Sequence, residues 1–103
     1  MKTIWKYDFP LGASVSQFSI EMPEGAQVLT AQLQGKFIVT CVLWAVVDDE
    51  MAPTERKFVA YWTGTPMQES VLEYHKYINT VIAPSGLVYH LFEVIKADTV
   101  NPL

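Results

Sequence analysis

The sequence is poor in cysteine, in positive charge and in clustered glycine, and each shortage excludes a class of protein. Cys41 is the one cysteine, so the chain forms no internal disulfide and is not a secreted disulfide scaffold. Seven Lys and Arg residues oppose eleven Asp and Glu residues, a net charge of −4 that disfavours binding to a nucleic-acid polymer. The five glycines are scattered among turns and form no phosphate-binding loop.

Long apolar runs are also missing. The longest apolar-rich stretch, Phe37–Val47, is about half the ~20 residues that a membrane-spanning helix needs. The first eight residues, MKTIWKYD, lack the apolar segment of a signal peptide. From these features, and from a length of 103 residues that begins at Met1, we expect one complete domain in the cytoplasm, without a membrane partner.

What the sequence does contain is a series of short segments with alternating polarity, separated by turn formers. Lys2–Asp8 places Trp5 and Tyr7 on one face. Val28–Leu33 places three apolar residues on one face, namely Leu29, Ala31 and Leu33. A period of two residues is typical of half-buried strands. Similar segments predict further strands at Phe18–Met22, Phe37–Val47, Arg56–Thr63, Tyr77–Ile82 and Leu87–Ile95.

These segments predict an all-β fold, either a small antiparallel sandwich or a partly closed barrel of about seven strands. Phe37–Val47 is apolar at almost every position, which indicates a central strand covered on both faces. One short helix is expected at most, near residues 66–77. Residues 1–96 are expected to form a single β domain, and residues 97–103 an exposed tail or an arm on a neighbouring subunit.

The residues that could bind a metal ion are dispersed. Cys41, His75 and His90 match no zinc pattern, so we predict neither a metal site nor a cofactor. Asp48, Asp49 and Glu50 form an acidic loop that could bind a hard cation weakly, although a solvated loop tip is the simpler interpretation. We expect His75 to be exposed.

No nucleophile with its base can be recognised, so the sequence does not indicate an enzyme. Cys41 lies within an apolar strand, where a buried structural thiol is expected. His90 alternates with Val88 and Phe92 on one strand face, which favours a hydrogen-bonded core or interface histidine. The alternative is a small hydrolase that uses His90 and a nearby carboxylate such as Glu93.

The strongest indication of ligand binding comes from the strand expected at Arg56–Thr63 and the turn that follows it. Alternation puts Arg56 and Trp62 on one face of this strand and Lys57 and Tyr61 on the other. Cations can hold a phosphate, aromatic rings can stack on a base, and hydroxyls can donate hydrogen bonds. This combination suits a small anionic, nucleotide-like ligand. The candidate ligand-binding residues are Arg56, Lys57, Tyr61, Trp62, Thr63, Thr65 and His90.

A purely structural interpretation of the same strand stays open. In it, Phe58 and Trp62 belong to the core and Tyr61 lies at the surface. Arg56 would then pair with Glu55 or with an acid of the loop at residues 48–50.

Seven segments of the chain together form a recognisable series. In order they are Thr3–Tyr7, Ile20–Ala26, Leu43–Asp48, Glu55–Phe58, Thr63–Pro66, Tyr77–Val81 and Gly86–Glu93. This series resembles a family of short uncharacterised proteins encoded mainly by bacteriophages and prophages. The resemblance runs from Lys2 to Glu93, and the tail lies outside it. It implies a compact β-rich fold, a phage-type setting and no established activity, and it supplies no catalytic residues.

Together these observations lead us to expect a small non-enzymatic accessory protein that acts by stoichiometric binding in the host cytoplasm. Small phage proteins of this kind often counter host defences, here by sequestering a nucleotide-type signal or by blocking a host protein. A structural component of a phage particle is the second hypothesis. We also expect a homo-oligomer, because unpaired strand edges offer a seam between copies.

Overall fold

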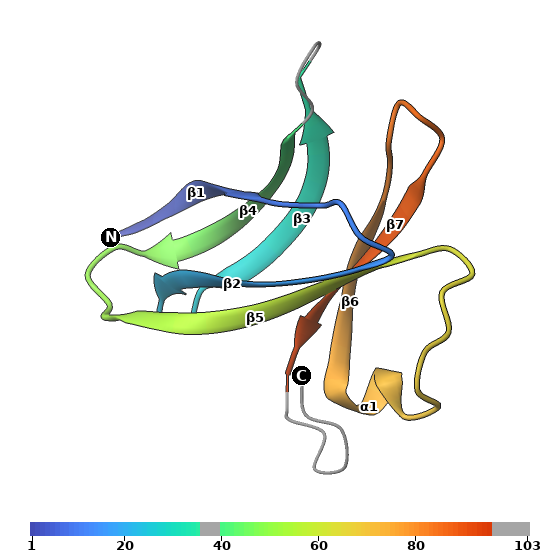
Figure 1. Ribbon diagram of the computed structural model, residues 1–103. Coiled ribbons are helices and arrows are strands. Elements are labelled where there is room, and N and C mark those ends of the chain that lie inside the picture. The colour runs from blue at the N-terminus through green and yellow to red at the C-terminus, as the bar shows by residue number, and fades with distance from the viewer. Residues whose placement is uncertain (36–39, 96–103) are drawn as a thin grey trace.

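The computed structural model describes residues 1–35 and 40–95 and shows the expected all-β fold (Figure 1). Seven strands and one short helix follow each other along the chain. The elements are β1 (Lys2–Phe9), β2 (Val15–Pro23), β3 (Gln27–Gln34), β4 (Thr40–Asp48), β5 (Pro53–Trp62), α1 (Val71–Tyr74), β6 (His75–Ile82) and β7 (Val88–Val94).

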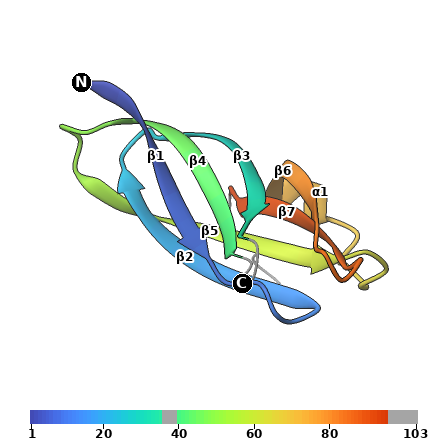
Figure 2. The same ribbon diagram turned by 90° about the horizontal axis from the view of Figure 1, so that it is seen from above.

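The strands form two antiparallel sheets that face each other as an open sandwich. The three-stranded sheet has the order β1-β4-β3, and the four-stranded sheet has the order β2-β5-β7-β6. Seen from above, the three-stranded sheet lies across β2 and β5 (Figure 2). A sandwich is therefore the correct one of the two expected architectures, because the sheets do not close into a barrel.

β4 is the central strand of its sheet, as the apolar stretch Phe37–Val47 predicted. It pairs with β1 on one side and with β3 on the other. Its odd-numbered residues from Cys41 to Val47 face the core and are at most 3% exposed. On the outer face Val42 is buried, whereas Trp44 and Val46 are half-buried, so this face is covered only in part. Residues 37–39 of the expected strand lie outside the described residues.

Because β3 contains a bulge, the face predicted for Leu29 is wrong. The register of β3 against β4 shifts between Val28 and Thr30. Ala31 stays in the core, but the shift leaves Leu29 44% exposed instead of buried beside it. A bulge places one extra residue on one strand, and the alternation of faces then changes phase at that point.

The side chain of Asn79 connects the two sheets by hydrogen bonds where β3 and β6 lie side by side. Its Nδ2 donates to the carbonyl oxygen of Ala31 at 2.7 Å, and the N–H of Ala31 donates to its Oδ1 at 2.9 Å. Asn79 follows a register shift in β6, so its side chain provides the two bonds that a neighbouring strand would otherwise make.

Replacing Asn79 by Ala should lower the free energy of unfolding by about 2 kcal/mol, because the buried peptide groups of Ala31 lose both partners. Urea denaturation measures this change. The control is Gln32→Ala, an exposed neighbour on β3, which should change stability by less than about 0.5 kcal/mol. Equal effects of the two substitutions would contradict the bridging role.

The expected helix is shorter than residues 66–77, and the histidine beside it is buried. α1 is one turn long, and β6 begins directly after it at His75. His75 is 8% exposed, and its Nδ1 lies 2.9 Å from the carbonyl oxygen of Val71. The expectation that His75 is exposed is therefore wrong. Within residues 1–35 and 40–95 no helix is long and apolar enough to span a membrane, and the tail at residues 97–103 lies outside them.

Candidate functional site

The four-stranded sheet divides the predicted ligand-binding residues between its two faces. The pairing of β5 with β2 and β7 confirms the predicted alternation. Arg56 and Trp62 point between the two sheets, and Lys57 and Tyr61 point to the outer face. These four side chains therefore do not converge on one ligand.

Arg56 is bound inside the sandwich by a partner that the sequence interpretation did not name. Its guanidinium forms a two-point ion pair with Glu93, with Nη2 2.9 Å from Oε1, and its Nη1 donates to the carbonyl oxygen of Ala26 at 2.8 Å. The two side chains are 21% and 12% exposed. Hydrogen bonding to Glu93 raises the pKa of Arg56 above its ordinary value. The expected pairing with Glu55 or the acidic loop is thus wrong.

Trp62 and Tyr61 pack on opposite faces of β5. Trp62 lies against the core and contacts Tyr89 edge to face, as the structural interpretation expected. Its buried indole N–H has no hydrogen-bond partner in the described part of the chain. Tyr61 is only 9% exposed and contacts Phe92 and His75, so the expectation of a surface tyrosine is wrong. Burial raises the pKa of Tyr61.

The structure brings Thr63 and His90 together on the outer face of the four-stranded sheet. Thr63 Oγ1 lies 2.7 Å from His90 Nε2, and Thr80 Oγ1 lies 2.9 Å from His90 Nδ1. The Tyr77 hydroxyl continues this chain at 2.7 Å from Thr80 Oγ1. His90 is therefore the hydrogen-bonded histidine that was expected. Thr80 and Tyr77 were missed, since only the register of β6 against β7 places them beside it.

Two other residues singled out from the sequence lie apart from this series of hydrogen bonds around His90. Thr65 Oγ1 makes a long 3.4 Å hydrogen bond to the carbonyl oxygen of Ser14. Glu93, the carboxylate suggested for a hydrolase, points between the sheets toward Arg56 and not toward His90.

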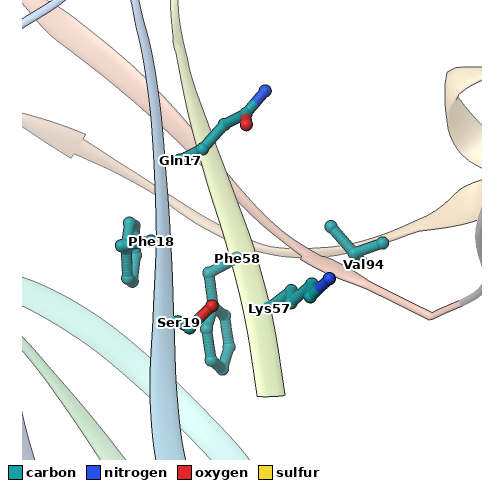
Figure 3. Close-up of a pocket in the computed structure, with 6 residues that line it drawn as sticks. All are labelled: Gln17, Phe18, Ser19, Lys57, Phe58 and Val94. Carbon is teal, nitrogen blue, oxygen red and sulfur yellow. The ribbon is translucent and has the colours of Figure 1, made fainter. Parts of the chain in front are cut away.

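Lys57 lines a shallow cavity of about 260 Å³ on the outer face (Figure 3). Gln17, Lys57 and Val94 project to the same side of β2 and β5, and the Phe18 ring lies on the other side. Lys57 is the one cation among its described lining residues, and the Ser19 hydroxyl beside it donates to Glu55 Oε1 at 3.4 Å. This cavity is separate from the His90 chain.

A second cavity lies at one end of the sandwich, and we call it the end pocket. Its volume is about 550 Å³, within the usual range for small-molecule sites. The ends of β1, β3 and β4 and the β6–β7 turn surround it. None of its described lining residues is charged. Its walls are built mainly from Phe9, Leu11, Leu33, Cys41, Leu87 and Tyr89, and Thr40 and Ser85 supply hydroxyls.

Cys41 is the one nucleophilic thiol of the chain and lies in the wall of the end pocket. It is 3% exposed, and burial raises its pKa to about 12. At neutral pH the group is therefore a protonated thiol and a poor nucleophile. This agrees with the expected structural role.

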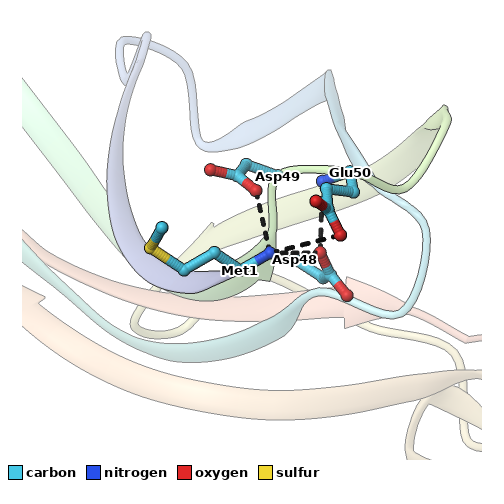
Figure 4. Close-up of polar contacts among 4 residues, drawn as sticks. All are labelled: Met1, Asp48, Asp49 and Glu50. Carbon is cyan, nitrogen blue, oxygen red and sulfur yellow. Dashed lines mark hydrogen bonds and ion pairs between the residues drawn. The ribbon is translucent and has the colours of Figure 1, made fainter.

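The acidic loop binds the amino group of Met1 (Figure 4). That ammonium lies 3.1 Å from Asp48 Oδ1, 3.1 Å from Asp49 Oδ1 and 3.6 Å from Glu50 Oε2. Hydrogen bonds to Asp49 and Asp48 raise the pKa of the amino group, and the backbone N–H of Glu50 lowers the pKa of Asp48. No cluster of His, Cys, Asp and Glu suited to a metal ion is found in residues 1–35 and 40–95.

Comparison with known proteins identifies the family. No curated protein and no solved structure matches the chain. One family model matches residues 1–101, so the likeness extends beyond Glu93, where the sequence resemblance ended. The chain therefore belongs to the family described as "Domain of unknown function (DUF7352)".

Proposed function

We propose that this protein acts by stoichiometric binding, without catalysis, and that the end pocket holds its ligand. The observation that carries the proposal is a cavity of about 550 Å³ between the ends of the two sheets, with mainly apolar walls. Largely apolar pockets with a few polar groups are the usual form of small-molecule sites.

The lining favours an uncharged, largely apolar ligand over an anionic nucleotide. A phosphate group needs a cation or several N–H donors beside it. The described lining offers two hydroxyls, from Thr40 and Ser85, and no Lys or Arg. Arg56, the one arginine, is held by Glu93 elsewhere in the sandwich. In the phage-type setting implied by the sequence resemblance, such a pocket would sequester a small host molecule.

Among the described residues of the pocket wall, the one thiol is not reactive, which supports binding over catalysis. Cys41 is protonated at neutral pH, because its pKa is about 12. The hydrolase alternative would have to use His90 and Thr63 on the outer face, where Thr80 holds the second ring nitrogen in place of a carboxylate. Threonine is a weaker orienting group than the carboxylate of a catalytic triad.

Binding of a neutral fluorescent probe, N-phenyl-1-naphthylamine, tests the proposal. We expect saturable binding of one probe per chain. Leu11→Trp should fill the pocket and weaken probe binding at least tenfold, since leucine and tryptophan differ greatly in volume. Leu72→Trp is the matched control, because Leu72 is 71% exposed on α1.

A melting-temperature screen with cyclic dinucleotides and ADP-ribose derivatives tests the nucleotide alternative. A true ligand at one hundred times its Kd stabilises the fold by about 2.7 kcal/mol. Stabilisation by a nucleotide, with probe binding unchanged in Leu11→Trp, would overturn the apolar-ligand proposal. Stabilisation by apolar compounds alone would support it.

A further inference from the structure

β1 is a long edge strand with an exposed free side. It stands at the end of the order β1-β4-β3 and pairs with β4 alone among the described strands. Most of its residues are exposed, including Ile4 at 58% and Trp5 at 41%. Natural edge strands are commonly shortened, bulged or covered to prevent pairing with another chain. β1 has eight residues in continuous register with β4.

The backbone groups on the free side of β1 can be identified. The N–H of Asp49 donates to the carbonyl oxygen of Met1, which directs the backbone of Met1 toward β4. Backbone direction alternates along a strand, so the following odd-numbered residues also bond to β4. The N–H and C=O groups of four residues therefore point away from the sheet: Lys2, Ile4, Lys6 and Asp8.

The charges of these residues are complementary under a twofold axis. In an antiparallel pair centred on Trp5, Lys2 lies opposite the partner's Asp8, and this contact occurs twice by symmetry. A shift of two residues in one direction would place Lys2 opposite the partner's Lys6. The same shift in the other direction would place Lys6 opposite its own copy. Like charges directly opposite each other are unfavourable, so the charge pattern favours the register centred on Trp5 over both of these neighbouring registers.

The same register places suitable side chains on the inner face. Trp5 lies opposite its own copy, and Thr3 lies opposite the partner's Tyr7. These are the non-hydrogen-bonded pairs of the ladder, in which side chains come closest. Aromatic cross-strand pairs are favourable there.

We propose that two copies of this chain form a twofold dimer through antiparallel pairing of β1 with β1, in the register centred on Trp5. The pairing joins the two three-stranded sheets into one sheet of six strands. Four facing residue pairs supply about eight backbone hydrogen bonds. The dimer does not depend on the end pocket or its ligand.

Native mass spectrometry and sedimentation over a range of concentrations test the dimer. We expect a species of twice the mass of one chain. Ile4→Pro removes an N–H on the free side of β1 and should abolish this species. Gln17→Pro is the matched control, because the bond from the N–H of Trp62 to the carbonyl oxygen of Ser14 places Gln17 on the free side of β2. A monomer at all concentrations, or dissociation by Gln17→Pro alone, would overturn the proposal.

Disulfide cross-linking tests the register. Trp5→Cys should give a covalent dimer when copper phenanthroline supplies the oxidant. The two Cα atoms would lie about 4.5 Å apart, within disulfide range. Thr3→Cys should not cross-link, since its two copies would lie about 14 Å apart. Cross-linking by Thr3→Cys and not by Trp5→Cys would overturn this register.

Charge exchange provides a second test without cysteine. Asp8→Lys should weaken the dimer about tenfold, because two attractive contacts become repulsive. Adding Lys2→Asp to Asp8→Lys restores opposite charges across the axis and should recover most of the affinity. A double variant as weak as Asp8→Lys alone, with an unchanged circular dichroism spectrum, would count against the contact.

Discussion

Replacement of Arg56 by Met is expected to lower the free energy of unfolding by about 3 to 5 kcal/mol. The guanidinium satisfies both carboxylate oxygens of Glu93 and the carbonyl oxygen of Ala26. Methionine has a comparable apolar stem but no donor. The carboxylate of Glu93, which is 12% exposed, would be left in the sandwich without a positive partner.

The reverse substitution, Glu93→Leu, should be similarly destabilising, since it leaves the charge of Arg56 unpaired. The double variant should lose less than either single variant, because replacing both partners of a buried pair by apolar residues is often close to neutral. Urea denaturation of the four proteins completes the cycle. Lys57→Met is the control, because Lys57 is the exposed neighbour on the opposite face of β5. Additive losses in the double variant would show that the pair is not coupled.

Alternation made the strands and most of their faces predictable. A strand places successive side chains on opposite faces whatever its neighbours are, so Trp62 and Phe58 could be assigned to the core from sequence alone. The same rule excludes Glu55 as a partner of Arg56, because adjacent residues face apart.

The partner of Arg56 could not be found in this way. Glu93 is 37 residues away along the chain, and only the register of β5 against β7 brings the two side chains together. A one-residue shift of that register would turn Glu93 to the outer face. The register between strands far apart in the sequence depends on the packing of the whole core, so a local sequence pattern cannot predict it.

The bulges and the end pocket could not be predicted for the same reason, since both depend on how strands far apart in the sequence pack together. Alternation predicts Leu29 on the same face as Ala31 and Leu33, but the register shift in β3 changes the phase at this residue. The end pocket combines the ends of three strands with the β6–β7 turn, and its residues are scattered along the chain. A cavity made by the spacing between sheets has no sequence motif.

Replacement of Phe58 by Ala is expected to lower the free energy of unfolding by about 3 to 5 kcal/mol. Phe58 is 1% exposed, and its ring stacks on Phe18 with centroids 5.5 Å apart. Phe18 stacks in turn on Phe9 at 4.5 Å. The three rings come from β5, β2 and β1, so the stack crosses from one sheet to the other.

The stack contributes more to the free energy of unfolding than its buried area alone suggests. It connects β1 and β2, which have no backbone hydrogen bonds to each other. β1 pairs with β4, and β2 pairs with β5. Loss of the Phe58 ring leaves Phe18 without support on one side, and the contact of Phe18 with Phe9 weakens as a result. Phe58→Leu should therefore cost about 1 to 2 kcal/mol, since it keeps most of the apolar volume.

Urea denaturation distinguishes this role from a general sensitivity of the fold. Tyr77→Ala removes an aromatic ring of similar size that is 51% exposed, and it should cost much less than Phe58→Ala. The effects of Phe9→Ala and Phe58→Ala should not add, because both act through the ring of Phe18. Strictly additive losses would show that the rings contribute only by their separate burial and that other contacts, such as the bonds of Asn79 to Ala31, join the two sheets.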